Sequence, residues 1–596
     1  MKTWLFLAAS LWAAASAIAA PLRWRVIEPW LDPAGKELFT HGGNMLTWSD
    51  LAHISPVTPL GHYIQWVADE GFNGMALYCD PDDNPAAFRT FLRYLEPRGI
   101  RVFIRHDWNE IEIGRSWPIV PSDPAPRASR KLNPFDPSVR AYWRQRIARD
   151  YAQFPEIAGY RMSGTEFYFD NGAPWMGEGV GMAAKSGREC VIAALDLIAG
   201  ALAPHGGTVV WETCQDDAWG QRQELWYFRD LTGAVPDNAF ILIKDHYWDY
   251  HPGWPAHPLD YVIRKDRQGR SPYITSVQLP GEYMGVNDFP WCQVAHLSEV
   301  MRTAEATGQQ GFWVVDNPLG HEPWDHPLNL VNWYGVRALM RDPGSDPERI
   351  IHAWAASRYG EAAAGTVAAV VRDVSDAARG AFEFDALFTA AHSRFPTLSY
   401  LDSHLCGPLR RAARMKGMMG LVLPLDMYPP EVEAALRANP ATRLVFNQVP
   451  ITPELKRQAL AQKDGAVAAM RRAIAAWATL RGKIADSDYA PVAGGLELNL
   501  NDARAFAAMM RLYMDWKLGQ LTESELDTTL AAEGARHGAA VPWLGDPHPA
   551  SVTVVEPASL KTFAEELRRE LRHPALEQYW RDHPNPHVTY LISPSH

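Results

Sequence analysis

The segment GFNGMALYCDPDDNPAAFRTFLRYLEPRGIRVFIRHDW, residues 71–108, decides the fold class of this chain. It contains two short apolar runs, Asn73–Tyr78 and Arg101–His106, which are rich in aliphatic and aromatic residues and follow turn-forming residues, as strands do. Between them, Pro85–Leu95 has the apolar spacing of an amphipathic helix. The segment is therefore predicted to form a strand–helix–strand unit with parallel strands.

Similar units continue on both sides of this segment, from about residue 42 to residue 340. Eight strands alternating with helices over this length predict an α/β fold, the closed (β/α)8 TIM barrel. An open doubly wound sheet is the alternative, but no glycine-rich phosphate-binding sequence follows the first strand. The predicted strands are Asn44–Trp48, Asn73–Tyr78, Arg101–His106, Ile157–Ser163, Thr208–Glu212, Ala239–Lys244, Tyr273–Leu279 and Gly311–Val315. The predicted helices are Pro59–Glu70, Pro85–Leu95, Pro137–Gln153, Lys185–Leu202, Val294–Thr307 and Leu328–Met340.

The pattern changes after Arg341, where strand signals nearly vanish and alanine-rich helical patterns dominate. With 596 residues, the chain is long enough for more than one domain. We therefore expect a signal peptide at 1–20, a catalytic barrel at 21–341 and a mainly α-helical C-terminal domain at 342–596. The predicted helices of this last part are Pro347–Tyr359, Ala362–Ala381, Pro453–Ile484, Asp502–Lys517, Glu523–Gly534 and Leu560–Leu571.

The first 20 residues have the features of a secretory signal peptide. Lys2 precedes an apolar run that ends in Ala17-Ile18-Ala19, and Pro21 disfavours a cut directly before it, so cleavage is expected after Ala19. A single membrane anchor is the alternative, but the run is short and rich in alanine. We therefore expect a periplasmic or secreted protein with no membrane span after signal cleavage.

Composition favours a soluble globular protein that binds neither nucleic acid nor an anionic membrane. Hydrophobic residues make up 47% of the chain and the formal net charge is −12. The 24 tryptophans suit stacking on sugar rings, although most are expected in the core. The five cysteines lack C-x-x-C spacing, so we expect buried free thiols. His106, His246 and His326 lack H-x-H and H-E-x-x-H spacing, so neither a metal nor another cofactor is expected.

The catalytic candidates come from the residues that follow each predicted strand, because active sites of (β/α)8 barrels lie at the C-terminal ends of the strands. Cleaving a glycosidic bond takes one protonated carboxyl group and one ionised carboxylate that activates water or attacks directly. Glu166, Asp249 and Glu282 each follow a strand end among aromatic residues. They are therefore the predicted catalytic residues. The predicted substrate-binding residues are Lys244, His246, Trp248, Arg161, Glu212, Trp211, His106, Asp107, Tyr283 and Asp316.

At these segments the sequence resembles glycoside hydrolase family 67, the xylan α-1,2-glucuronidases, over most of residues 22–360. The resemblance implies an inverting mechanism without metal, in which Glu166 protonates the glycosidic oxygen while Asp249 and Glu282 activate the attacking water. It also implies a helical C-terminal domain that forms a homodimer. The similar segments are YIQWVADEGFNGMAL (63–77), GIRVFIRHDW (99–108), LNPFDPSVRAYWRQRIARDYAQFPEIAGY (132–160), GTEFYFDNGAP (164–174), NAFILIKDHYWDYHPGWPAHPL (238–259), SVQLPGEYMG (276–285) and WDHPLNLVNWYGVRALMRDPGSDPERIIHAWAASRYG (324–360).

The sequence departs from the family pattern where the family binds the uronate carboxylate. The family carries a lysine four residues before the acid and an arginine at the end of strand 5, whereas this chain has Met162 and Glu212 there. Lys244, five residues before Asp249, keeps its cationic match. Arg161, Arg105 or His246 are the candidates to compensate. We expect no counterpart of the family's N-terminal β-rich domain, because the predicted barrel starts close to the expected signal cleavage site.

We therefore expect an α-glucuronidase-like inverting glycoside hydrolase that removes α-linked (methyl)glucuronosyl residues from xylan or related plant oligosaccharides. One alternative is a glycosidase of the same barrel type that acts on a non-uronic sugar, with Glu282 as nucleophile if it is retaining. The separation of the two carboxyl groups distinguishes the mechanisms, at about 5 Å for retention and about 6.5–9.5 Å for inversion. A non-catalytic carbohydrate-binding protein is the alternative from another class.

Overall fold

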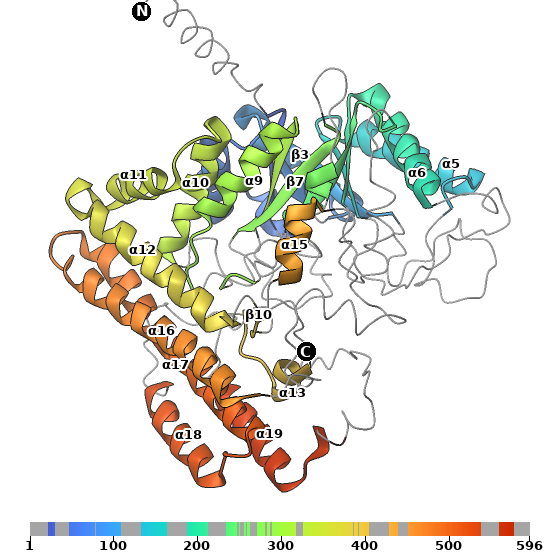
Figure 1. Cartoon of the computed structure of the whole chain (residues 1–596). Coiled ribbons are helices and arrows are strands. Elements are labelled where there is room, and N and C mark those ends of the chain that lie inside the picture. The colour runs from blue at the N-terminus through green and yellow to red at the C-terminus, as the bar shows by residue number, and fades with distance from the viewer. Residues whose placement is uncertain are drawn as a thin grey trace, which may run out of the picture.

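The computed structural model of the chain shows a closed β-barrel followed by a set of long helices (Figure 1). The barrel and its helices lie at one end of the molecule, and the last helices lie at the other. The structure describes residues 22–29, 47–77, 79–108, 133–163, 187–212, 234–246, 250, 256–257, 259–262, 271–279, 283–285, 289–316, 326–384, 387–390, 393–403, 428–438, 451–537, 559–576 and 578.

Eight parallel strands close the barrel in chain order, and β1 pairs with β8 along its whole length. This confirms the predicted (β/α)8 fold. Gly159, which opens β4, has a φ of 149°, and a Cβ atom there would lie 1.7 Å from the carbonyl oxygen of Thr208, so only glycine fits. The strands are β1 (Trp24–Pro29), β2 (Gly74–Leu77), β3 (Arg101–Asp107), β4 (Gly159–Ser163), β5 (Thr208–Glu212), β6 (Ala239–Lys244), β7 (Tyr273–Leu279) and β8 (Gly311–Asp316).

The prediction of the first strand was wrong. The barrel begins with β1 at Trp24–Pro29, whereas the predicted strand Asn44–Trp48 runs into the short helix α2 (Trp48–Ala52). A capping box starts this helix: the amide of Asp50 donates to the Thr47 hydroxyl, and the amide of Thr47 donates to the Asp50 carboxylate. Residues 44–46 lie outside the described part of the chain.

Several helices around the barrel begin where a capping residue precedes proline. Thr58, Asn84 and Asp136 each accept a hydrogen bond from an amide of the first turn and are each followed by proline at the first helical position. Proline at this position loses no helical hydrogen bond, so the start of each helix is well defined. The helices of the barrel region are α3 (Pro59–Asp69), α4 (Pro85–Leu95), α5 (Pro137–Gln153), α6 (Gly187–Leu202), α8 (Leu259–Val262), α9 (Val294–Ala306) and α10 (Leu330–Arg341).

Beyond α10 the described chain is almost entirely helical. The helices α12, α16 and α17 lie side by side and extend away from the barrel, with α18 and α19 at the far end (Figure 1). Within the described residues, no helix combines the length and the apolar character that crossing a bilayer demands. The helices are α11 (Pro347–Tyr359), α12 (Glu361–Phe382), α13 (Leu398–Ser403), α15 (Pro430–Ala438), α16 (Pro453–Ala478), α17 (Asp486–Lys517), α18 (Glu523–His537) and α19 (Ser559–Arg572), and a two-stranded sheet is formed by β9 (Glu383–Phe384) and β10 (Leu387–Phe388).

Helices α13 and α15 were not predicted, and α16 and α17 differ most from their predicted bounds. Helix α16 ends at Ala478 rather than at Ile484, and the chain then turns through Gly482 at a φ of 72°. Helix α17 starts 16 residues before the predicted Asp502 and contains Pro491. Burial of Val492, Leu496 and other side chains of its first half outweighs the low helix propensity of proline and glycine there.

Two apolar clusters form the core. One lies inside the barrel and includes Val26, Phe103, Phe240 and Trp313. The other lies between the strands and the surrounding helices, and it continues without a break to Leu567 in α19. The predicted boundary after residue 341 therefore coincides with a change of secondary structure within one continuous outer core; that it separates two domains stays a prediction.

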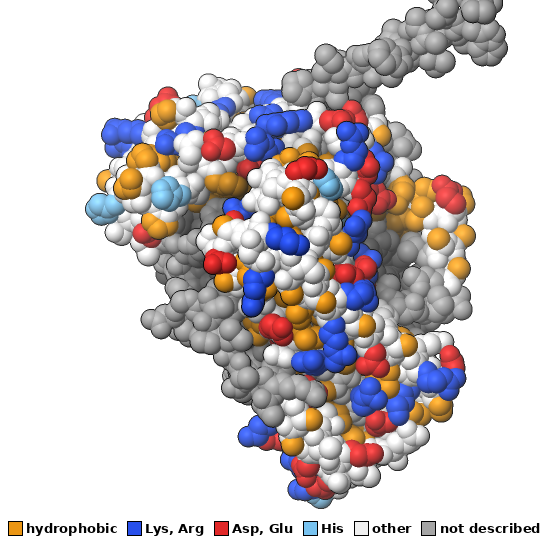
Figure 2. Space-filling model, turned by 90° about the vertical axis from the view of Figure 1, so that its left-hand side faces the viewer, with side chains coloured by type: hydrophobic (Ala, Val, Ile, Leu, Met, Phe, Trp, Pro, Cys, Tyr) orange, Lys and Arg blue, Asp and Glu red, His pale blue; other side chains and the backbone are white. Residues whose placement is uncertain are grey.

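The described surface and cysteines agree with the composition. On the face shown in Figure 2, acidic and basic side chains are interspersed among the described residues. Cys79 and Cys190 are buried, as predicted, and Cys292 is a free thiol whose pKa is raised to about 12 by burial. Cys214 and Cys406 lie outside the described residues.

Candidate functional site

Charged side chains line the barrel interior near the C-terminal ends of the strands. Alternate residues of a strand point into a barrel, so the residues two positions beyond the apolar interior residues of β1, β3, β5 and β6 also point inward. On β4, Arg161 lies two positions beyond Gly159 and contacts the inward-pointing carboxylates of β1 and β5. These residues all bear charges, and each is at most 8% exposed. We call this set the inner charge cluster: Glu28, Arg105, Arg161, Glu212 and Lys244.

The inner charge cluster is held together by ion pairs between different strands. Arg161 lies between two carboxylates, with its Nη2 2.6 Å from Oε2 of Glu212 and its Nε 3.3 Å from Oε2 of Glu28. Arg105 donates from Nη1 to Oε1 of Glu28 at 3.3 Å, and the indole of Trp313 donates to Oε2 of the same carboxylate at 2.7 Å. Each of these carboxylates therefore has a cationic partner from another strand, which offsets part of the cost of burying it.

Tyr250 connects Lys244 to β7. Its hydroxyl lies 2.9 Å from Oγ of Ser276, and the Lys244 ammonium lies 4.9 Å from the centre of its ring. Burial raises the pKa of Tyr250 well above 10, the charge of Lys244 acts against this, and the charge of Glu212 adds to it. The tyrosine is therefore a neutral partner that helps to hold the lysine at the barrel mouth.

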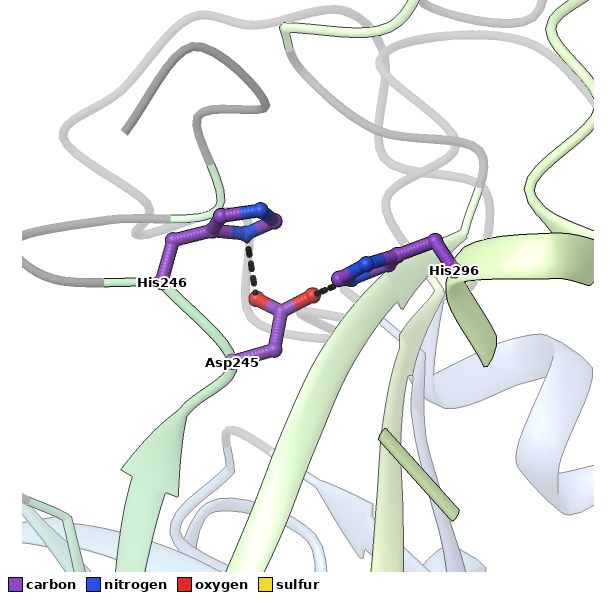
Figure 3. Close-up of side chains that lie close together, drawn as sticks. All are labelled: Asp245, His246 and His296. Carbon is purple, nitrogen blue, oxygen red and sulfur yellow. Dashed lines mark hydrogen bonds and ion pairs between the residues drawn. The ribbon is translucent and has the colours of Figure 1, made fainter. Parts of the chain in front are cut away.

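A second group of side chains meets on the outer side of β6, at the same end of the barrel. Asp245 follows Lys244 and lies between the imidazoles of His246 and of His296, which comes from α9 (Figure 3). Its Oδ2 is 2.6 Å from Nε2 of His296, and its Oδ1 is 3.1 Å from Nδ1 of His246. Burial opposes ionisation of Asp245, but the charge and contact of His246 and the hydrogen bond of His296 hold its pKa below the usual value.

Four other predicted substrate-binding residues are not brought into the inner charge cluster. His106, Trp211, Tyr283 and Asp316 are buried in or beside the layer between strands and helices. The ring of His106 contacts Tyr160 at 4.7 Å between ring centres. The hydroxyl of Tyr63 on α3 donates to Asp316 at 3.0 Å, and burial raises the pKa of Asp316 to about 7 against the effect of this bond. Their role in substrate binding stays a prediction.

The three predicted catalytic carboxylates, Glu166, Asp249 and Glu282, lie outside the described residues, as does Trp248; Asp107 belongs to β3, but its side chain is not described. Their immediate neighbours in sequence are informative. Tyr250, next to Asp249, lies in the barrel interior, and Tyr283, next to Glu282, is buried against the outer core. The roles of the three carboxylates stay predictions.

The sequence analysis missed Glu28, Tyr250, Ser276 and His296 as site residues. Glu28 was missed with its strand, and the alternation Trp24, Val26, Glu28 is the signal that identifies it. The pairing of Asp245 with His296 joins residues that only the packing of α9 brings together. Met162, in the place of a family lysine, is buried in the outer core, while its neighbour Arg161 points inward.

Comparisons with known proteins agree with this architecture. The middle domain of glycosyl hydrolase family 67 matches residues 19–317. Alpha-glucuronidase A of Aspergillus tubingensis is 22% identical over 370 residues, and the probable alpha-glucuronidase A of Aspergillus niger is 23% identical over 373 residues. Each alignment covers 57% of this chain and 41% of the relative, so the chain spans less than half the length of these curated relatives.

A solved structure shares the fold. A GH138 enzyme targeting pectin rhamnogalacturonan II superposes with a TM-score of 0.51 at 12% identity, covering 94% of this chain and 69% of that one. Together with the charged mouth of the barrel, these likenesses define the class of the molecule as a (β/α)8-barrel protein of the glycoside hydrolase type. The chain belongs to glycosyl hydrolase family 67, through the middle domain of that family.

Proposed function

We propose that the protein is an α-glucuronidase-like glycoside hydrolase that releases α-linked glucuronosyl or methylglucuronosyl residues from xylan or a related plant oligosaccharide. The observation that carries the proposal is the inner charge cluster at the C-terminal end of a family 67 barrel. The relatives named α-glucuronidase support the choice of reaction and of sugar. All residue roles below follow from this proposal.

The proposed reaction is a single displacement by water. Glu166 donates a proton to the glycosidic oxygen as the bond between that oxygen and the anomeric carbon breaks. The water oxygen attacks the same carbon from the opposite face, and Asp249 and Glu282 position this water and take up its proton. The inner charge cluster contributes a fixed, nearly dry electrostatic environment at the barrel mouth, which needs little reorganisation during the reaction.

The charge of the inner charge cluster favours an anionic sugar. Among its five members, three side chains are cationic and two are anionic, so one positive charge is in excess. A sugar carboxylate entering this low-dielectric mouth would be attracted by that excess. Lys244 is the best candidate to bind it, because it lies at the C-terminal end of β6 and keeps the cation of the family pattern. In this proposal Arg161 takes the place of the missing family lysine as a local cation.

A second candidate function is hydrolysis of a neutral sugar, and the Arg161–Glu212 ion pair favours it. The 2.6 Å contact uses a guanidinium group that a uronate would otherwise bind. Glu212 stands where the family has an arginine, so the same position contributes a negative instead of a positive charge. An anionic substrate is then held by fewer cations than in the family.

A substrate panel distinguishes the two candidates. The full chain is incubated with aldouronic oligosaccharides and with neutral oligosaccharides of matched length, and the released sugar and its anomeric form are followed by NMR. Release of glucuronic or methylglucuronic acid as the β anomer supports the proposal with an inverting mechanism. Release of the α anomer overturns inversion, and release of a neutral sugar alone selects the second candidate. Hydrolysis of nothing in the panel, with sugar binding retained, favours a carbohydrate-binding protein.

Glu166→Gln tests the catalytic assignment in the same assay. Loss of turnover with unchanged sugar binding is expected, because glutamine keeps the shape of the side chain without the transferable proton. Full activity of this variant would remove Glu166 from the role of acid. Export and homodimerisation belong to the same proposal; N-terminal sequencing of the exported protein and its mass in solution test them.

A further inference from the structure

The structure assigns a divalent metal site, of the kind that holds Zn²⁺, to Asp245, His246 and His296. Their nearest ligand atoms, one carboxylate oxygen and two imidazole nitrogens, all lie within 4.8 Å of one another (Figure 3). Two imidazoles with one carboxylate form a ligand set that suits Zn²⁺ and leaves a fourth position for water. Among the described residues, this is the group of histidine, cysteine and acidic side chains that meets this condition.

Two buried atoms of the cluster point to a missing partner. Oδ1 of Asp245 and Nδ1 of His246 have no hydrogen-bond partner in the described part of the chain, although they are 3.1 Å apart. The two atoms are close enough for an ion pair, but their angles are not those of a hydrogen bond. Leaving polar atoms buried and unpaired is costly, so an ion that accepts both lone pairs would remove a destabilising feature.

The distances need little adjustment to accept the ion. Four ligand atoms at the usual zinc–nitrogen and zinc–oxygen bond lengths are separated from one another by about 3.4 Å in a tetrahedral site. The two contacts of Asp245, at 2.6 and 3.1 Å, are somewhat shorter. Both imidazoles therefore have to move slightly away from Asp245, and the two ligand atoms that are farthest apart, within 4.8 Å of each other, have to come closer together. The side chain of His296 is 29% exposed, so it has room for this shift.

The residues around the cluster hold its carboxylate in place, as the supporting residues of a metal site do. The backbone amide of Asp245 donates to the carbonyl of Ser276, and the carbonyl of Asp245 accepts from the amide of His257, so the carboxylate is held on a rigid backbone. A second carboxyl group nearby, on Asp260 of α8, also has a buried oxygen without a hydrogen-bond partner among the described residues. A bound cation would therefore have a second carboxyl group as a close neighbour.

The ion would stabilise the barrel mouth by linking a helix to a strand end. It would tie α9 to the end of β6 through Asp245 and His246, which lie in the sequence between Lys244 and Asp249. The part of this inference that concerns Asp249 rests on the proposed function. Metal binding itself does not, so the two are tested separately.

The test uses the full chain, with any affinity tag removed, after treatment with a chelator. Titration with ZnCl2 by calorimetry is expected to show one site per chain, and CoCl2 is expected to give the visible absorption of low-symmetry nitrogen and oxygen coordination. His296→Gln keeps an amide that can donate to Asp245 but removes the imidazole ligand. It is expected to weaken zinc binding by more than about 100-fold, since even the loss of a supporting residue costs 10- to 100-fold.

His62→Ala, which removes an exposed histidine of α3, is the matched control and should bind zinc like the unchanged protein. His246→Ala is the second ligand variant, and a thermal unfolding scan of each variant shows whether it folds. Absence of zinc binding by the unchanged chain, or equal affinity in the folded His296→Gln variant, overturns the site and leaves a hydrogen-bonded His–Asp–His cluster. Because affinity is measured without substrate, these outcomes are independent of glycosidase activity.

Discussion

Two buried basic side chains, Arg161 in the barrel and Lys463 in the helical part, perform different tasks, and burial lowers the pKa of Lys463 to about 7. Arg161 lies between the carboxylates of Glu28 and Glu212, which come from other strands. Lys463 of α16 donates instead to the backbone carbonyls of Ala381 and Glu383 and to the hydroxyl of Thr389, around the C-terminal end of α12. Charges arranged around one another at strand ends create an electric field for a ligand, whereas a charge bound to helix carbonyls joins two elements.

The largest effect is expected from Arg161→Met, which removes the cation between two buried carboxylates. The free energy of unfolding should fall by about 3–5 kcal/mol, because both carboxylates lose a buried partner. The kcat/KM per folded molecule should fall by at least about 100-fold, as expected when a site loses its geometry. Urea unfolding and the oligosaccharide assay measure the two effects. Arg372→Met is the control: its ion pair with Glu348 is exposed on both sides and should contribute less than about 1 kcal/mol.

Lys463→Met should separate stability from activity. The change leaves two buried carbonyls without their donor, so the free energy of unfolding should fall by about 2–4 kcal/mol. The kcat/KM per folded molecule should stay within about twofold, if the lysine only joins α16 to α12. A loss of activity as large as that of Arg161→Met would contradict the division into a functional and a structural buried cation.

Asp316 differs from the arginine-paired carboxylates of the barrel, because the hydrogen-bond donor to this buried carboxyl group is the neutral hydroxyl of Tyr63. Its pKa is raised to about 7, so the folded protein holds this proton over the pH range in which the unfolded chain, with an ordinary pKa of 3.8, has lost it. Stability from this group is therefore present below pH 3.8 and is lost as the pH rises through 7. Relative to Asp316→Asn, the unchanged protein should lose on the order of 4 kcal/mol between about pH 4 and about pH 8. Parallel pH profiles of the two proteins would contradict this assignment.

The smallest effect is expected at Ser393, where the helical part meets the loop after β7. Ser393 has a φ of 61°, and its Oγ accepts a hydrogen bond of 2.8 Å from the amide of Gly285. Both Ser393→Ala and Ser393→Gly lose this hydrogen bond. Alanine keeps the steric strain of a left-handed backbone conformation, whereas glycine adopts that conformation without strain. The glycine variant should therefore be more stable than the alanine variant by about 1 kcal/mol. Equal thermal stability of the two would show that the backbone there is not strained.

The parts of the fold that the sequence predicts well have local causes. The helices that start at Pro59, Pro85, Pro137, Pro347 and Pro453 had their first residues predicted correctly, because a capping side chain before proline marks the first turn. Strands β5, β6 and β7 were predicted to the residue, since each is a buried aliphatic and aromatic run. Helix α17 was only half predicted, because the burial that stabilises its first half is a property of the packed molecule.

The candidate site divides in the same way. The rule that active sites follow barrel strands was enough to name Arg161, Glu212 and Lys244, which meet in the inner charge cluster. It was not enough to tell inward from outward positions, so His106 and Asp316 were included although they face the helices. Placing the first strand too late in the chain also hid Glu28, the carboxylate on which both arginines converge.

The unbroken outer core has a consequence for how such a chain changes over evolution. The apolar surfaces of α9 and α10 are covered by α11 and the helices beyond it, and among the described residues no second core begins after residue 341. Recombination at that residue would join the barrel to a different protein segment and would leave the apolar surfaces of α9 and α10 exposed to water. A barrel that is transferred to another protein is therefore expected to be transferred together with the helices after residue 341. The barrel and these helices should be inherited as one unit.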